Sequence, residues 1–243
     1  FTKKLIKKSI LANAVIATDE SIIAIVKKNL NIEDNKIVLI PNSINVFRLR
    51  AYVQEEQAGE KNNNENIISL VSIGRIEYNK GYDLLAAALG VFKKEYPNIK
   101  LKWTHFGRGK KKEEVFDIAK KEHVDLHIID NASDAEVQIN LAKCDIFIQP
   151  SRYEGSSLTT LEAMAHGCLI VATPVGGIPD KIKNLKTGFL CKHADVQSIK
   201  NTLHEAITYS DKKSIKANAY AMAENVFDIS ASTQKYHALY TSF

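Results

Sequence analysis

Short apolar runs and longer amphipathic segments alternate along most of this chain. From Ile67 onward the apolar runs have strand length, and the segments between them carry apolar residues at helical spacing. Strands are predicted over 67–74, 101–107, 125–130, 145–150, 168–172 and 188–191. Helices are predicted over 82–96, 111–122, 133–144 and 158–167. This alternation predicts an α/β fold, a doubly wound parallel sheet with helices on both faces.

Two of these helices carry terminal signals. Pro97 ends the first predicted helix, and Ser133 with Glu136 forms a capping box at the start of the third. One face of the first helix is apolar and is expected in the core: Leu85, Ala88, Leu89 and Phe92. These signals define where the loops begin, and the loops carry the candidate chemistry.

Residues 1–46 have a different organisation. Asp19 or Ser21 is expected to cap a helix here. The expected elements are a basic helix over 3–13, a strand over 14–17, a helix over 21–30 and a strand over 36–42. Two strand–helix pieces cannot bury a sheet by themselves, so this part is predicted to be the partial end of another α/β domain.

The other boundaries follow from composition and from the last helical pattern. Residues 47–66 are polar and contain three consecutive asparagines at 62–64, which predicts a linker or loop. Residues 67–227 form the predicted main domain. Residues 228–243 are predicted to form a C-terminal helix that packs back toward the N-terminal part.

Composition narrows the class of protein. Of the 243 residues 45% are hydrophobic, and 33 basic against 28 acidic side chains give a mild net charge of +5. The sparse thiols Cys144, Cys168 and Cys191 show no CxxC spacing, which indicates neither a zinc site nor a disulfide scaffold but a reducing, cytoplasmic compartment. No apolar run approaches membrane-span length, no signal peptide is expected, and a chain that begins at Phe1 is expected to be a fragment.

The stretch 150–177 holds the most informative side chains. In the helix expected after Leu158, Glu162 falls within a stripe formed by Leu158, Leu161 and Ala165. A carboxylate on a core-facing stripe is costly unless a polar group meets it. Glu162 is therefore a candidate ligand-binding acid, and the alternative is a structural acid bonded to a backbone amide. Glu154, in the preceding Gly/Ser-rich turn, is a second candidate.

Two polar loops are expected at the same place in the sheet. In a doubly wound sheet of order 3-2-1-4-5-6, strands 1 and 4 are neighbours and their outgoing loops part to leave a crevice. The loop after the first strand is 74–81, and the loop after the fourth is 151–157. With this assumed order, both loops flank the crevice where a ligand binds.

The residues in these loops suit a diphosphate. Arg75 and Lys80 supply two cations, and an arginine can grip two phosphate oxygens at once. Gly74 and Gly81 allow tight turns and close approach of a ligand. The helix N-terminus opened by Gly155, Ser156 and Ser157 presents free N–H groups to an anion.

Several segments together resemble a known family. They are 74–85 (GRIEYNKGYDLL), 106–109 (FGRG), 144–177 with two glutamates separated by seven residues, 187–190 (TGFL) and, more loosely, 12–42. The chain resembles the C-terminal, donor-binding half of a GT-B retaining glycosyltransferase of group 1, also called family 4, with a remnant of the N-terminal domain. This resemblance covers most of the chain.

The resemblance implies a role for each matching residue. Arg75, Lys80 and Glu154 would be catalytic: the two cations neutralise the donor diphosphate, and Glu154 contacts the donor sugar. Glu162 would hold the ribose. The other substrate-binding residues would be Gly74, Gly107, Arg108, Gly155, Ser156, Ser157, Leu158 and Thr159. Residues 130–133 would lie near the base.

The implied activity is transfer of a sugar, of the hexosyl type, from a nucleoside-diphosphate sugar to a glycan or lipid-linked acceptor with retention of configuration. The resemblance implies no metal and no cofactor besides the donor, and a role in polysaccharide biosynthesis. The isolated chain is expected to bind donor and to be incomplete for transfer, since most of the acceptor domain is absent.

The sequence departs from the family pattern at several places. Ser43 follows Pro41-Asn42 where glycine is usual, and 167–173 lacks the usual proline. Asp180 replaces a glutamate, and Asn131 stands where glycine is common, which leaves the base pocket open.

Two other classes of function stay open. The chain could be a non-catalytic, GT-B-like interaction subunit. An NAD-dependent oxidoreductase is less favoured, because Lys112 occupies the third glycine position of the GxGxxG fingerprint. The lysines of 3–8 favour a solvated helix face over peripheral contact with an anionic membrane, and no basic aromatic surface predicts nucleic-acid binding. His105 and His166 are not favoured as catalytic groups.

Overall fold

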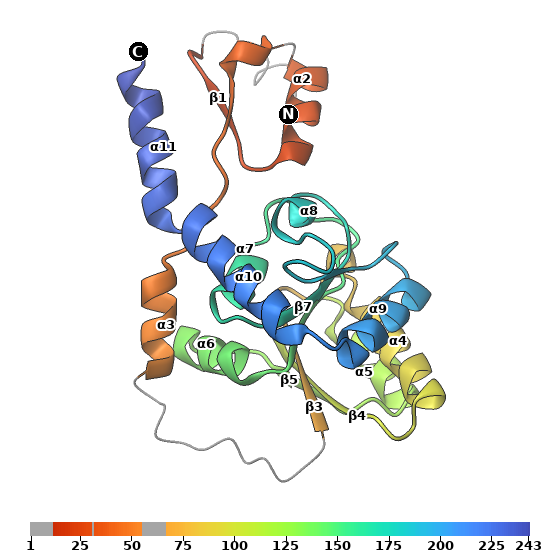
Figure 1. Ribbon diagram of the computed structural model, residues 1–243. Coiled ribbons are helices and arrows are strands. Elements are labelled where there is room, and N and C mark those ends of the chain that lie inside the picture. The colour runs from red at the N-terminus through yellow and green to blue at the C-terminus, as the bar shows by residue number, and fades with distance from the viewer. Residues whose placement is uncertain (1–11, 31, 55–66) are drawn as a thin grey trace.

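The computed structural model describes residues 12–30, 32–54 and 67–243, and its centre is a six-stranded parallel sheet (Figure 1). The strands are β3 (Ile67–Ile73), β4 (Lys100–Phe106), β5 (Leu126–Ile129), β6 (Ile146–Gln149), β7 (Leu169–Ala172) and β8 (Phe189–Leu190). Their order is β5-β4-β3-β6-β7-β8, with every pair parallel. The predicted strands and the assumed order 3-2-1-4-5-6 are confirmed.

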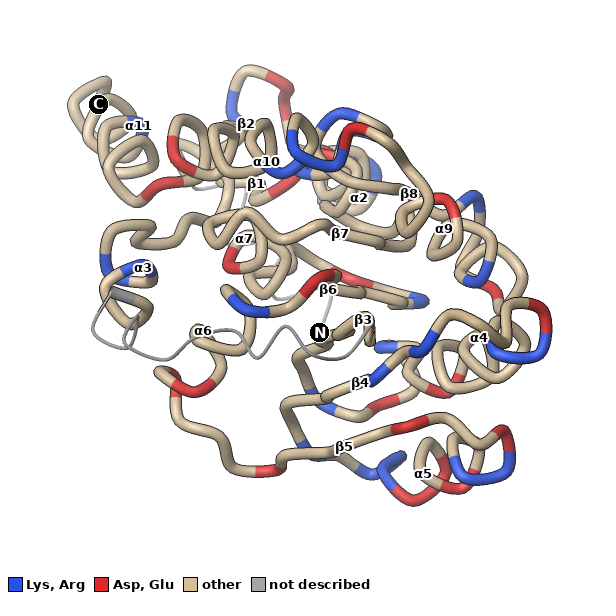
Figure 2. Tube along the Cα trace, turned by 60° about the horizontal axis from the view of Figure 1, so that its bottom comes forward, with Lys and Arg blue, Asp and Glu red and all other residues tan. Residues whose placement is uncertain are grey.

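Helices cover both faces of this sheet. One face carries α4 (Tyr82–Glu95), α5 (Lys112–Lys121) and α9 (Val196–Thr208). The other face carries α6 (Asp134–Lys143), α7 (Leu158–Ala165), α10 (Lys212–Val226) and the short α8 (Ile178–Lys181). The fold is therefore the doubly wound α/β class that the sequence predicts. Helix α5 carries charged residues of both signs (Figure 2), while its Val115 and Ala119 are buried.

Alternating side chains of the central strands feed two hydrophobic cores. In β6, Ile146 and Ile148 face the core shared with α4 and α9, whereas Phe147 faces the core shared with α7 and α10. This alternation is the period of two expected of a strand buried on both faces. The four residues predicted to share the apolar face of α4 are all buried: Leu85, Ala88, Leu89 and Phe92.

A smaller unit precedes the main domain. It consists of β1 (Val15–Ala17), α2 (Glu20–Leu30), a 3₁₀ turn (Asp34–Lys36) and β2 (Ile37–Leu39), and the two strands are parallel. Asp19 caps α2, since its Oδ1 accepts the N–H of Ile22 at 3.1 Å. The basic helix predicted over 3–13 falls, up to residue 11, outside the described residues.

The linker or loop predicted over 47–66 begins differently in the structure. Residues up to 54 form a helix, α3 (Val46–Gln54), that packs on α6 and α7. Its first N–H groups are capped from two sides: Asn45 Oδ1 accepts from Arg48 N at 2.8 Å, and Asp228 Oδ2 accepts from Val46 N at 3.1 Å. The second cap comes from a residue distant in sequence, so local composition could not reveal it. Residues 55–66 lie outside the described part.

The chain ends in α11 (Ile229–Thr241), as predicted for the C-terminal segment. The start of this helix contacts the segment that leaves the N-terminal unit: Ser232 Oγ lies 2.7 Å from Ser43 Oγ, and Ile229 N donates to Ile44 O. From there α11 extends toward the end of the molecule that holds β1 and α2 (Figure 1). Of the helices in the described ranges, none is long and apolar enough to cross a membrane.

Candidate functional site

The loops that follow β3 and β6 meet at the carboxyl edge of the sheet. Gly81, at φ +70°, lies so close to the second loop that a Cβ there would be 2.1 Å from the carbonyl oxygen of Pro150. The backbone N–H of Arg152 donates to Asn79 O at 2.8 Å. Glycine is therefore required at 81 for two reasons, its left-handed conformation and the absence of a side chain. The predicted meeting of these loops is confirmed.

Arg152 clamps the two loops together. Its guanidinium makes a bidentate pair with Asp83, with N···O distances of 2.7 and 2.6 Å, and donates to Tyr78 O at 2.9 Å. It also lies 4.3 Å from the centre of the Tyr78 ring. Burial raises the pKa of Asp83, but the bonds from Arg152 outweigh it and leave the pKa below the ordinary value. The sequence reading did not single out this clamp, although Arg152 and Asp83 lie within the resembling motifs.

Glu154 is held by three donors that converge on one oxygen. Its Oε1 accepts from Lys80 Nζ at 2.5 Å, from Gln149 Nε2 at 2.8 Å and from Ser151 Oγ at 3.0 Å. The side chains of Lys80 and Glu154 are only 19% and 7% exposed. Two candidate residues 74 positions apart thus form one buried, hydrogen-bonded ion pair.

Gln149 and Ser151 are site residues that the sequence reading missed. Both are buried, and Gln149 Nε2 also donates to Ser151 Oγ at 2.8 Å. The signal was present: Gln149 is the polar last residue of an otherwise apolar strand, immediately before the candidate loop. A buried polar side chain needs a partner, and here the partner is a candidate ligand-binding acid.

The first loop is also locked to the turn after β4. Gly107 lies so close to this loop that a Cβ there would be 2.1 Å from Gly74 O. Ile76 N donates to Arg108 O at 3.0 Å, and Gly74 N donates to Phe106 O at 2.9 Å. The structure therefore brings the predicted residues Gly74, Gly107 and Arg108 together.

His105 fixes the carbonyl group of Gly74. Its Nε2 lies 3.1 Å from Gly74 O and its Nδ1 lies 2.8 Å from Ser72 Oγ, which also accepts from Trp103 Nε1. A carbonyl oxygen can only accept, so Nε2 carries the proton and Nδ1 accepts from the serine hydroxyl. Burial lowers the pKa of His105 to about 4, and the ring is neutral at neutral pH. His105 thus supports the loop structurally.

The two predicted arginines, Arg75 and Arg108, are exposed. Within the described part of the chain, the Arg75 guanidinium makes no hydrogen bond or ion pair, in contrast to the paired Lys80. Arg108 is anchored through its backbone bond to Ile76, and its side chain likewise has no partner in the described ranges. Both cations are available to an anionic ligand.

The N-terminus of α7 begins as predicted. Ser157 is the N-cap and its Oγ accepts from Thr160 N, while Gly155 has open space where a Cβ would lie. Leu158 is 46% exposed. Thr159 Oγ1 donates to Gln149 Oε1 at 3.2 Å, so the first turn of α7 is joined through Gln149 to Glu154. The first N–H groups of a helix lack partners within it and favour an anion.

Glu162 lies on the other side of α7, toward α6. Burial raises the pKa of Glu162, a hydrogen bond from Gln138 lowers it by less, and the Asp134 carboxylate raises it further. Gln138 Oε1 in turn lies 2.7 Å from His166 Nε2. The acid predicted to hold the ribose is therefore near α6, which begins directly after the segment 130–133 that was predicted to lie near the base.

In the structure the candidate site residues form two separate groups. Lys80, Glu154 and the start of α7 form the first, with the Gly74 loop beside them. Glu162 and the start of α6 form the second. No hydrogen bond or ion pair joins Arg75 to Glu162 in the described part of the chain. Arg75 lies in the loop after β3, and Glu162 lies on α7, the helix that follows the neighbouring strand β6.

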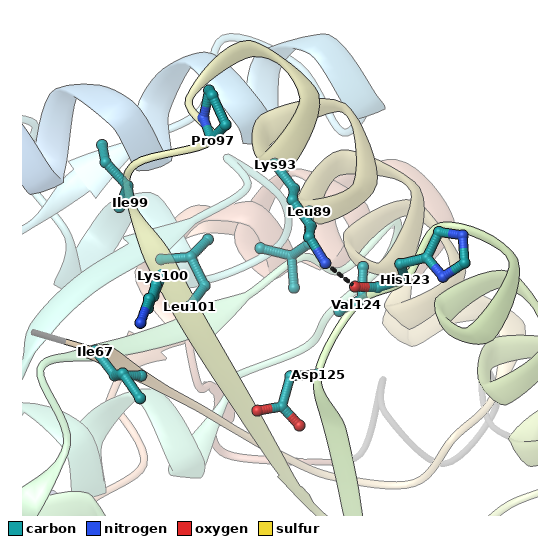
Figure 3. A pocket seen from close by; sticks show the side chains of 10 residues that line it. All are labelled: Ile67, Leu89, Lys93, Pro97, Ile99, Lys100, Leu101, His123, Val124 and Asp125. Atoms are coloured by element: carbon teal, nitrogen blue, oxygen red, sulfur yellow. Dashed lines mark hydrogen bonds between the residues drawn. The ribbon is translucent and has the colours of Figure 1, made fainter. Parts of the chain in front are cut away.

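The pocket shown in Figure 3 lies away from the candidate site. A pocket of about 240 Å³ lies at the opposite edge, where β3, β4 and β5 begin (Figure 3). Leu89, Leu101 and Val124 line it, and Lys93 donates across it to His123 O at 2.6 Å. No described group of three or more His, Cys, Asp or Glu side chains is arranged to hold a metal ion.

The sequence relatives are longer than this chain. The glycogen synthase of Mycobacterium tuberculosis (strain ATCC 25618 / H37Rv) is 28% identical over 166 residues, which cover 68% of this chain and 38% of that protein. An uncharacterized 41.2 kDa protein of the cps region of Klebsiella pneumoniae is 25% identical over 215 residues, 87% of this chain and 57% of its own length. The chain thus spans about two fifths to three fifths of these relatives.

Solved structures share the fold. Anabaena Alr3699/HepE, in complex with UDP and glucose, matches 100% of this chain and 68% of its own, with a TM-score of 0.80 and 18% identity. The C-terminal domain of a glycosyl transferase group 1 family protein (LpcC) of Francisella tularensis matches 76% of this chain and 99% of its own, with a TM-score of 0.62 and 24% identity. Residues 53–222, more than half of the chain, match the family described as glycosyl transferases group 1. The chain belongs to the glycosyl transferases group 1, and its sheet has the Rossmann-like topology of GT-B glycosyltransferases.

Proposed function

We propose that this chain is the donor-binding part of a glycosyltransferase that uses a nucleoside-diphosphate sugar. The observation that carries the proposal is the buried pair of Lys80 and Glu154 at the carboxyl edge of β3 and β6, joined to the start of α7. A cation, an acid and a helix N-terminus at the switch point of a parallel sheet suit a phosphorylated sugar. Family membership supports the same reaction class.

In this proposal each group has a separate task. Arg75, exposed and without a partner among the described residues, grips phosphate oxygens. Lys80 neutralises the diphosphate and holds Glu154, which accepts hydrogen bonds from the sugar hydroxyls. The N–H groups of 155–159 bind phosphate, Gly107 and Arg108 line the nucleotide, and Glu162 accepts from the ribose.

The same groups account for the chemistry. As the bond between the sugar and the diphosphate breaks, negative charge grows on the leaving nucleotide, and fixed cations and N–H groups stabilise it. Because side chains supply this charge, the proposed reaction uses no cofactor besides the donor. Transfer of a hexosyl group with retention, to a glycan or lipid-linked acceptor, is part of the proposal and requires an acceptor domain that can close over the site.

The compartment is also a proposal. Cys144, Cys168 and Cys191 are buried free thiols, and they support a reducing, cytoplasmic environment. Peripheral contact with an anionic membrane is left as an alternative within this proposal.

Calorimetric titration of the chain with UDP, GDP and ADP tests the proposal. We expect saturable binding of one of these diphosphates, and UDP is the first probe because the structurally similar Alr3699/HepE was solved with it. Binding of none of the three would overturn the donor role. Titration with NAD is the parallel control for the oxidoreductase alternative.

A further inference from the structure

A buried lysine that has no role in the proposed donor contacts bonds to the loop 151–157, called the donor loop below. Lys181, the last residue of α8, is 1% exposed. Its Nζ donates to Ser156 Oγ at 3.1 Å and to Gly177 O at 3.0 Å. A lysine so deeply buried is unusual, and these bonds are what offset its loss of water.

Carboxylates from three different elements act on this ammonium. Burial lowers the pKa of Lys181, whereas Asp19, Asp180 and Glu154 each raise it. Asp19 belongs to the N-terminal unit, Asp180 to α8 and Glu154 to the donor loop. Of these three acids, Glu154 is paired with Lys80, whereas Asp19 and Asp180 make no ion pair with a described residue.

The backbone that carries Lys181 is fixed on both sides. Gly177 N donates to Gly155 O at 3.0 Å, and a Cβ at Gly176 would lie 2.0 Å from Glu154 O. On the other side, Glu20 N donates to Asp180 Oδ2 at 2.8 Å. The segment 176–181 is thus held between the donor loop and the start of α2, which makes Lys181 a rigid anchor.

We propose that Lys181 is a positioning residue for donor binding, which holds Ser156 and through it the loop 154–157 in the conformation that receives the diphosphate. This inference rests on the proposed function. The ammonium reaches the loop through the Ser156 hydroxyl and does not reach the solvent, so Lys181 acts on the donor through Ser156 rather than by contact.

Two substitutions cut the same bond from opposite ends. K181M keeps the length of the side chain and removes its charge, and S156A removes the acceptor without altering the buried lysine. K183M is the matched control, because Lys183 is an exposed lysine two residues further on, and among the described residues its side chain bonds only to Pro179 O. Thermal unfolding of each variant reports whether the fold is retained.

Calorimetry with UDP and UMP on the full chain gives the decisive comparison, or with the GDP/GMP or ADP/AMP pair if the wild-type chain prefers that base. We expect K181M and S156A each to weaken diphosphate binding about fivefold or more, with monophosphate binding within about twofold of wild type. The double variant is expected to lose no more than either single one, because both remove one interaction. K183M is expected to bind as wild type.

Three results would overturn the inference. They are diphosphate affinity unchanged in both K181M and S156A, equal losses for diphosphate and monophosphate, and losses that add in the double variant. If the wild-type chain binds none of UDP, GDP and ADP, the proposed function itself fails, and the inference falls with it. That outcome is distinct, because it is seen before any variant is measured.

Discussion

The ammonium of Lys80 lies 2.5 Å from Oε1 of Glu154, so the cation predicted to meet the donor phosphate already holds the acid predicted to meet the donor sugar. The pair is largely buried, with 19% and 7% of the two side chains exposed. Binding of a donor would therefore rearrange or share this interaction, and phosphate and sugar recognition are coupled at one pair.

Substitution of Lys80 tests this coupling. K80M leaves the Glu154 carboxylate buried with Gln149 and Ser151 as its remaining donors, at a cost of about 1.5–3 kcal/mol. In a chain of this size we expect the unfolding midpoint to fall by roughly 3–10 °C, and UDP affinity to fall with it. K80M/E154Q should recover part of the midpoint, because the unpaired charge is gone. A K80M variant with wild-type stability and affinity would contradict the coupling.

Arg75 should behave in the opposite way with respect to stability. Its guanidinium is exposed and has no partner within the described residues, so R75A is expected to leave the unfolding midpoint within about 1 °C of wild type. Loss of a charged contact to phosphate should weaken UDP binding about tenfold or more and uridine binding hardly at all. Calorimetry with both compounds measures this, and K110A, which removes an exposed charge from the neighbouring loop, is the control. Equal effects on UDP and uridine would argue against a phosphate contact.

Glu162 is expected to show a conflict between stability and binding. Burial raises its pKa, so as pH rises the unfolded chain loses this proton first and the folded state becomes less stable. E162Q should therefore raise the unfolding midpoint at pH 7 by about 1–3 °C, with no gain at pH values well below the ordinary glutamate pKa. E162Q also removes the charged acceptor of the proposed hydrogen bonds from the ribose, so we expect UDP affinity to fall about 10-fold to 100-fold.

The measurement is a pH series of thermal unfolding together with calorimetry at pH 7. E205Q, at an exposed position of α9, is the control for a change of net charge. An E162Q variant that is less stable at pH 7 and binds UDP normally would show that Glu162 is a structural acid.

His105 should make folding stability sensitive to acid. Its pKa in the folded state is about 4, whereas the unfolded chain takes up the proton near pH 6.5. Protonation of the unfolded state alone therefore lowers stability as pH falls from 6.5 to 4, by about 3 kcal/mol at pH 4, and has no effect above this window. His166, whose pKa is also lowered to about 4, contributes in the same direction.

Unfolding midpoints measured from pH 7.5 to pH 4 for the wild type and H105N test this. The unfolding midpoint of H105N should be lower than that of the wild type at neutral pH, because the hydrogen bond to Gly74 O is lost. As the pH falls, the midpoint of H105N should then decline less steeply. H193Q, at an exposed histidine, should keep the wild-type slope. Parallel curves for wild type and H105N would contradict a neutral, buried His105.

Much of the fold could be predicted because its signals are local. The apolar runs of β3 and β6, Pro97 after α4 and the Ser133 cap of α6 each act within a few residues. The strand order then followed from a topology rule for parallel sheets. The helix α3 was missed because half of its cap comes from Asp228, 182 positions away from Val46.

The candidate site shows the same division. Lys80 and Glu154 could be proposed from motif and loop position, and their pairing agrees with the expected convergence. The polar side chains that hold them could not be proposed from those signals. The bond from Lys181 to Ser156 and the pair of Arg152 with Asp83 join residues 25 and 69 positions apart, and only the folded chain shows them as neighbours.

The missing Cβ at Gly81 has a consequence for engineering and for evolution. Because Gly81 packs against the carbonyl of Pro150, the loop after β3 and the loop after β6 each restrict the conformation of the other. A chimera that imports only one of them from a relative would inherit a steric mismatch. Donor preference in such hybrids should therefore transfer only when both loops are exchanged as a unit.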